Sequence, residues 1–146
     1  LNSSKETAMP ASNYTETNII EALLRGGTFQ QATRIYVGLH TGNPTDAGGS
    51  EVTAGAWPDY ARVDAAKGGT VDEGWTASVD GVCKNELQLI FPVHNGPSDI
   101  TISHFALYDA ATGGNMLTYG ELVSPRTLSP NDVYVAGVQQ LTVQVT

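Results

Sequence analysis

The fold is decided by the stretch Arg34-Ile35-Tyr36-Val37-Gly38-Leu39-His40. Its apolar residues recur at every second position, which places Ile35, Val37 and Leu39 on one face of an extended chain. The turn residues Thr41-Gly42-Asn43-Pro44 follow and end the pattern. The stretch therefore predicts a β-strand with one buried face.

The same two-residue period recurs along the rest of the chain. Further strands are predicted near residues 60–63, 86–91, 100–108, 116–122, 133–136 and 138–145. Residues 109–115 have the length and glycine content of a hairpin loop between two of them. Seven short strands without alternating helices favour an all-β fold, an antiparallel β-sandwich or jelly roll, over a parallel α/β sheet.

The N-terminal residues carry a different signal. Residues 1–12 lack any apolar period and have little to bury, so they are expected to form an arm that is disordered or ordered only by a partner. Met9 and Pro10 give this arm a small apolar contact just before the next element. Residues 13–146 are expected to form a single β-sandwich domain.

One short helix is predicted where that domain begins. Asn13 is expected to cap it, with Glu16 completing a capping box. Gly26-Gly27 supplies the left-handed stop. Its apolar side chains recur at helical spacing and form one stripe, made of Ile19, Ile20, Leu23 and Leu24. We expect this stripe to cover part of the core.

Composition excludes several classes of function. The 146 residues include 7 Lys and Arg against 15 Asp and Glu, which gives a net charge of −8 at pH 7. Nucleic acid is not an expected partner, because binding it needs clustered basic side chains. No apolar run approaches the roughly 20 residues that span a bilayer, and the first ten residues lack a signal-peptide apolar core. No membrane partner and no export are therefore expected.

Motifs that carry chemistry are missing from the sequence. His40, His94 and His104 do not have the spacing of a metal site, no Gly-x-Ser-x-Gly elbow occurs, and the glycine pairs lack the ending of a phosphate loop. We expect no enzyme activity, with no catalytic, cofactor-binding or metal-binding residue. Cys83 is the only cysteine, and it is either a small core residue or one half of an intermolecular bridge.

The region from residue 46 to residue 84 is irregular and contains seven glycines, Trp57 and Trp75. Its carboxylates, Glu51 among them, are expected to form a solvated acidic surface, because no calcium-loop spacing is present. The two tryptophans either cap the end of the sandwich or, in one case, anchor a partner, since Trp contributes strongly to binding between proteins.

Several of these stretches, taken together over residues 12–145, resemble a family of small tailed-phage virion proteins. They are Ser12-Asn13-Tyr14, residues 34–44, Gly48-Gly49-Ser50-Glu51-Val52, Tyr60-Ala61-Arg62, Phe91-Pro92, residues 102–120 and residues 138–145. Members are labelled tail-fibre-like, and relatives of this kind look like capsid decoration proteins that sit as trimers on the phage head.

The resemblance implies a structural virion protein that needs no cofactor. The leading interpretation is a capsid decoration (cement) protein, made in the host cytoplasm, that binds the major capsid protein on the outer capsid surface as a homotrimer. One alternative is a tail-tip or tail-fibre-associated protein that contacts the host receptor, and another is a small hydrolase. The candidate partner-binding residues are Met9, Pro10, Tyr14, Trp57 and Trp75.

Overall fold

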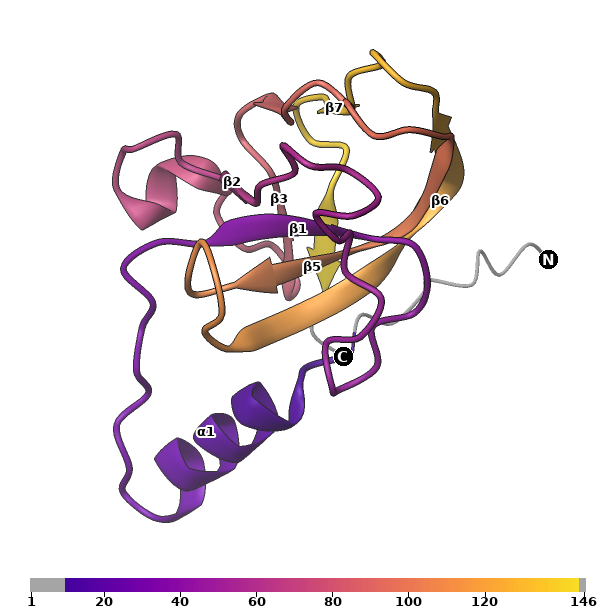
Figure 1. Ribbon diagram of the computed structural model, residues 1–146. Helices are drawn as coiled ribbons and strands as arrows, with labels where there is room; N and C mark the ends of the chain where they lie inside the picture. The colour runs from indigo at the N-terminus through magenta and orange to yellow at the C-terminus, as the bar shows by residue number, and fades with distance from the viewer. Residues whose placement is uncertain (1–9, 145–146) are drawn as a thin grey trace, which may run out of the picture.

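The computed structural model describes residues 10–144, and within them the predicted all-β class with one short helix is confirmed (Figure 1). The elements in chain order are α1 (Asn13–Leu24), β1 (Tyr36–His40), β2 (Val63–Asp64), the 3-10 turn η1 (Val71–Gly74), β3 (Val82–Lys84), β4 (Leu89–Ile90), β5 (Ile100–Tyr108), β6 (Met116–Leu128), β7 (Val135–Ala136) and β8 (Thr142–Gln144). No helix among these residues is long and apolar enough to cross a membrane.

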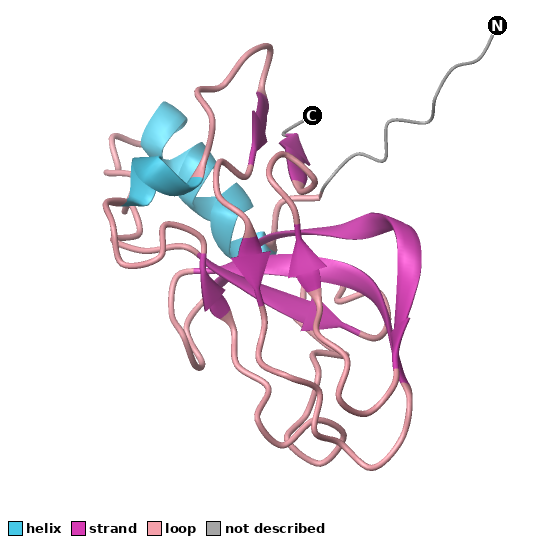
Figure 2. Ribbon diagram, turned by 90° about the horizontal axis from the view of Figure 1, so that it is seen from above, coloured by secondary structure: helices cyan, strands magenta, loops and turns pink. Residues whose placement is uncertain are grey.

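One antiparallel sheet, in the order β2-β1-β5-β6, forms the first layer. Its centre is the ladder between β1 and β5, in which Val37 pairs with Leu107 and Leu39 pairs with Phe105. All four of these side chains are buried in one cluster, so the predicted buried face of the first strand is confirmed. In Figure 2 the helix lies at one side of the strands, and long loops extend from the other.

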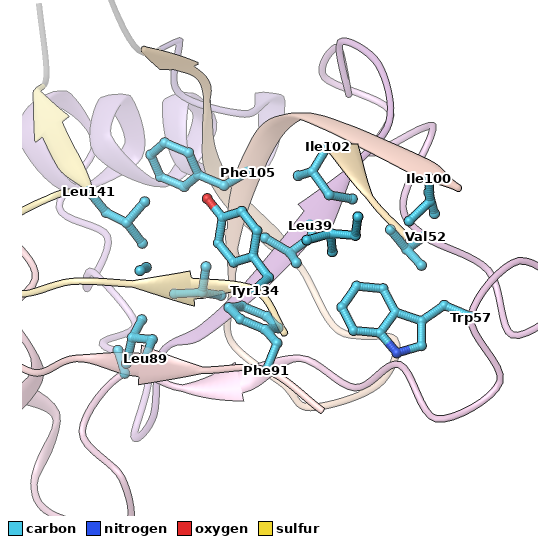
Figure 3. Close-up of a cluster of buried hydrophobic side chains, with 14 of the residues drawn as sticks. Leu39, Val52, Trp57, Leu89, Phe91, Ile100, Ile102, Phe105, Tyr134 and Leu141 are labelled. Carbon is cyan, nitrogen blue, oxygen red and sulfur yellow. The ribbon is translucent and has the colours of Figure 1, made fainter. Parts of the chain in front are cut away.

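Two short ladders, β3 with β8 and β4 with β7, form the opposite layer. The core lies between the layers, with Trp57 at one end and Leu141 at the other (Figure 3). Phe91 and Tyr134 meet edge to face in it, with ring centroids 5.6 Å apart. The fully buried Asn85 joins the two ladders, because its side chain bonds the carbonyl oxygen of residue 137 and accepts from the Leu141 amide.

Most of the strand predictions need correction, because the paired length of a strand differs from the length of its apolar pattern. The strands expected at 86–91, 133–136 and 138–145 pair only over β4, β7 and β8, which have two, two and three residues. The strand expected at residues 60–63 is reduced to β2, because Tyr60 and Arg62 direct their side chains into a polar network that is described below. The strand expected at 116–122 runs on to Leu128, where exposed residues pair with β5 through their backbone. The three-residue β3 carries too short a pattern to be predicted from the sequence.

The start of the helix also differs from expectation. Ser12, not Asn13, is the cap, because its Oγ accepts from the Thr15 amide at 3.3 Å. The same hydroxyl donates to the carbonyl oxygen of Met116 on β6. At the other end of α1, the expected left-handed stop is present at Gly26, where φ is 71°.

The last residues of the expected arm belong to the folded domain. Ala11 forms an antiparallel bridge with Thr118, the Ser12 amide donates to the carbonyl of residue 117 at 3.1 Å, and the Thr118 hydroxyl donates to the carbonyl of Pro10 at 3.0 Å. Residues 10–12 therefore extend the sheet beside β6 and need no partner to order them. Met9 and the rest of the arm lie outside the described residues.

The apolar stripe of α1 does not cover the core, contrary to expectation. No residue of the helix is buried, and Ile20, Leu23 and Leu24 are 50%, 73% and 76% exposed. The reason is geometric: α1 meets β6 near its own first residues and then runs away from the sheet (Figure 1).

We predict that Leu39→Asp will lower the free energy of unfolding by about 3 kcal/mol or more, since it places an unpaired carboxylate where Leu39 is 1% exposed. Thermal unfolding followed by circular dichroism measures the effect. Thr41→Asp, at an exposed position two residues on, is the control and should shift the midpoint little. Equal midpoints for the two variants would show that the assigned face is wrong.

Candidate functional site

A partly buried ion pair between Glu51 and Arg62 lies on the face of the main sheet opposite the core. The Arg62 Nε and Nη2 atoms donate to the two carboxylate oxygens of Glu51, each at 2.8 Å, so the pair is bidentate. The Arg62 side chain is only 8% exposed. Burial opposes ionisation of Glu51, but the Arg62 hydrogen bonds and charge prevail and lower the pKa of that carboxyl. Glu51 is therefore an ion-paired residue and not a member of the expected solvated acidic surface, whereas the carboxylates of Asp59, Asp72, Glu73 and Asp80 are exposed as expected.

Arg62 also holds the hairpin loop between β5 and β6. Its Nη1 donates to the carbonyl oxygens of Ala110 at 2.9 Å and Gly113 at 2.8 Å. The guanidinium lies 3.4 Å from the centroid of the Tyr108 ring, a cation–π contact. One side chain thus ties residues 109–115 to the loop that carries Glu51.

Tyr60 links this pair to the central strand. Its hydroxyl donates to Glu51 Oε1 at 3.0 Å and accepts from the Leu39 amide at 2.8 Å. Burial and the neighbouring Glu51 charge raise the pKa of Tyr60, so the hydroxyl stays protonated and remains a donor.

His40 completes the network from the fully buried end of β1. Its Nδ1 lies 2.8 Å from the Gly49 carbonyl and its Nε2 lies 3.0 Å from the Tyr108 hydroxyl. A neutral ring with the proton on Nδ1 satisfies both contacts, because Tyr108 then donates to Nε2. Burial lowers the pKa of His40 and raises the pKa of Tyr108 to about 12, so the structure favours this protonation state.

These five side chains are engaged with one another and with loop carbonyls. What the arrangement does chemically is to cross-link two loops to the sheet. In the described ranges, no group of three or more His, Cys, Asp or Glu side chains is placed to hold a metal ion.

An open pocket of about 350 Å³ lies above the network. It is formed where the start of α1, the loop after β1 and the hairpin loop after β5 meet. The lining residues are Ser12, Tyr14, Asp46, Ala47, Gly48, Glu51, Arg62, Tyr108, Gly113, Gly114, Asn115 and Met116.

The predicted partner-binding residues are dispersed in the structure. Pro10 is exposed beside β6, and Tyr14 is half-buried at the pocket. Trp57 is fully buried and its indole N–H donates to the Val93 carbonyl at 3.0 Å, so it has no exposed surface to offer a partner. Trp75 is half-buried and packs against the core. For these tryptophans the structure matches the alternative in which they close the sandwich.

A second candidate surface is the outer side of α1, which the sequence pattern had assigned to the core. Leu23 and Leu24 are its most exposed members, and Ile20 extends the patch toward the start of the helix. Phe29, in the segment that follows α1, is also 50% exposed. Large apolar side chains gathered on one exposed element are typical of a protein–protein contact.

Comparison with known protein families gives a match over most of the chain. The model of the family described as Podophage GP4 fiber I protein gp80 matches residues 10–144. This range includes the pocket, the Glu51–Arg62 pair and α1. No curated protein matches the chain.

We predict that Arg62→Met will lower the free energy of unfolding by about 2–3 kcal/mol, because it leaves the partly buried Glu51 carboxylate, 23% exposed, without its partner. Chemical denaturation measures the loss. The matched control is Arg25→Met, which removes an exposed pair with Glu21 and should cost under about 1 kcal/mol. Similar losses from both variants would refute a central role for the Glu51–Arg62 pair.

We predict that acidification destabilises the fold partly through His40. Its pKa is lower in the folded chain than the ordinary 6.5. Below pH 6.5 the imidazole of His40 is therefore protonated in the unfolded chain but stays neutral in the folded chain. The free energy of unfolding should therefore fall as the pH drops from about 7.5 toward 5. In His40→Gln this slope should be shallower over the same interval, and an unchanged slope would contradict the assignment.

Proposed function

The chain belongs to the Podophage GP4 fiber I protein gp80 family, and from that premise we propose that it is a fibre component that assembles with other virion proteins through α1. Membership makes it a tail-fibre-like structural protein of a bacteriophage virion. The fibre role is the more specific step, and the family's description favours it over capsid decoration. In this proposal the protein has no catalytic task.

The exposed face of α1 carries the proposal. A helix of 12 residues is marginal in water on its own, and most helices in proteins are stabilised by packing an apolar face. In α1 that face, with Leu23 and Leu24, is open to solvent. Burial of the two leucines against another protein would contribute roughly 1.5–3 kcal/mol each.

The partner we propose for α1 is another copy of the chain, in a homotrimer. Self-association requires a patch that does not repel itself, although the whole chain carries a charge of −8. Glu21 on α1 and Arg25, the residue that caps its end, form an ion pair at 3.0 Å, so their charges cancel beside the apolar patch. Three such helices brought together by a rotation axis would bury their leucines against one another.

We predict that the double variant Leu23→Ser, Leu24→Ser will be monomeric where the parent chain is trimeric. Sedimentation equilibrium measures the mass, and an unchanged thermal midpoint would show that the fold is kept. The matched control is Val123→Ser, because Val123 is fully exposed but lies on β6, outside the patch. A parent chain that is monomeric at all concentrations, or a trimer that survives in the double variant, would refute the proposed assembly.

The place in the virion is tested by copy number. A fibre component should be present at about three to a few dozen copies per particle, since fibres are few and their subunits follow cyclic symmetry. Gel densitometry of purified virions gives the count. Hundreds of copies would instead indicate capsid decoration, with the major capsid protein as the partner.

A further inference from the structure

The pocket above the ion pair has the dimensions of a small-ligand site. Its volume of about 350 Å³ is near the lower end of the range of roughly 300–1,000 Å³ for such sites. Its walls come from three segments that are distant in the sequence: Ser12 and Tyr14, residues 46–51, and residues 113–116. The ligand that fits is therefore about the size of one ring.

The walls are held in fixed positions before any ligand arrives. Thr45 and Ser50, at the two ends of the loop after β1, both have φ in the left-handed region, at 53° and 63°. Strained residues of this kind persist only where surrounding contacts hold them, and they are frequent at ligand sites. Here the Gly49 amide donates to the Pro44 carbonyl at 2.8 Å, and its own carbonyl is bound by His40.

The hairpin wall is equally constrained. At Gly114 φ is 69°, and a Cβ would collide with the Asp109 carboxylate and the Ala110 side chain. Asp109 accepts from both the backbone amide of Asn115, at 2.7 Å, and its side-chain amide, at 2.8 Å. A preformed site of this kind loses less entropy on binding.

Three lining residues keep polar atoms without a partner among the described residues. The Tyr14 hydroxyl has none, and the Asn115 amide oxygen is left over when its NH₂ group bonds Asp109. Asp46 receives only a long bond of 3.4 Å, from the Tyr119 hydroxyl to one carboxylate oxygen. One hydroxyl and two acceptors from three different segments thus line a single pocket.

The charge of the lining selects among ligand classes. Glu51 neutralises Arg62, which leaves Asp46 as the unpaired charge, so an anion is repelled. A metal ion lacks ligands here, because among residues 10–144 no group of three or more His, Cys, Asp or Glu side chains is placed to hold one. Apolar side chains are a minority of the lining, which excludes a purely apolar ligand. Hydrogen-bond acceptors, hydroxyls and aromatic rings, here those of Tyr14 and Tyr108, are the groups that bind a neutral, hydroxyl-rich ring.

We propose that this pocket binds a neutral sugar ring, with Asp46 and Asn115 accepting hydrogen bonds from its hydroxyls and Tyr14 contacting it with both ring and hydroxyl. The site is separate from the α1 face, so the inference goes beyond the proposed assembly. A variant that abolishes sugar binding in the pocket is therefore expected to keep self-association through α1, and a variant that abolishes self-association is expected to keep sugar binding.

Amide chemical shifts of the isotope-labelled full chain test the proposal by titration with glucose, galactose, mannose and N-acetylglucosamine. At least one sugar should shift the amides of lining residues such as Gly48 and Asn115, with a Kd on the order of 1 mM. No shift at the lining residues with any of the four sugars would overturn the proposal. Larger shifts with sulfate or phosphate than with sugar would also overturn it, in favour of an anion site.

Two variants assign the binding to the pocket. Asp46→Ala should weaken it about tenfold or more, since it removes an unpaired acceptor. Tyr14→Phe removes only a hydroxyl, and should weaken binding while leaving the thermal midpoint unchanged. The matched control is Asp72→Ala, an exposed carboxylate outside the pocket, with unchanged affinity. Equal affinities for all three variants and the parent chain would refute the site.

Discussion

The bidentate pair between Arg62 and Glu51 is the constraint on which the loop side of the structure depends. Taking both charges out of water is costly, and a pair of this kind is retained only when its remaining hydrogen-bonding groups are satisfied. Arg62 meets that condition by also bonding two carbonyls of the hairpin loop. All of these hydrogen bonds form together only when the loop after β1 and the hairpin after β5 are correctly placed on the sheet. The ion pair therefore fixes the positions of both loops.

A strand could be predicted from the sequence where its apolar side chains alternate and form one buried face. Val37 and Leu39 alternate with residues of the other face, and residues 100–108 do the same, so their period is visible in the sequence. The extension of β6 beyond Leu122 was not visible, because residues 123–127 are exposed and only Leu128 is buried, which leaves no apolar pattern. The period of apolar residues indicates which side chains of a strand are buried, but it does not indicate which other strand pairs with it through the backbone.

The candidate site was harder to predict for the same reason. Nothing near Glu51 in the sequence indicates that Arg62 will cover it, because the partner is supplied by the fold. Residue type left two roles open for Trp57, and the structure decides between them, because the indole N–H donates to the Val93 carbonyl inside the core. The stripe of α1 was predicted correctly as a helix face, yet the sequence could not say that this face is exposed in the single chain.

The two candidate surfaces share one mechanical connection, the Ser12 side chain. Its hydroxyl caps α1 and bonds the Met116 carbonyl of β6, and the same residue lines the pocket. Ser12 is 2% exposed, so the contact between α1 and β6 is tightly packed and restricts the orientation of the helix relative to the sheet. If α1 is held in an assembly, the direction in which the pocket opens is fixed with it, because the cap of the helix and the wall of the pocket are the same residue. Self-association through α1 would then present identical pockets in a symmetric array, which raises the avidity of a site whose single affinity is weak.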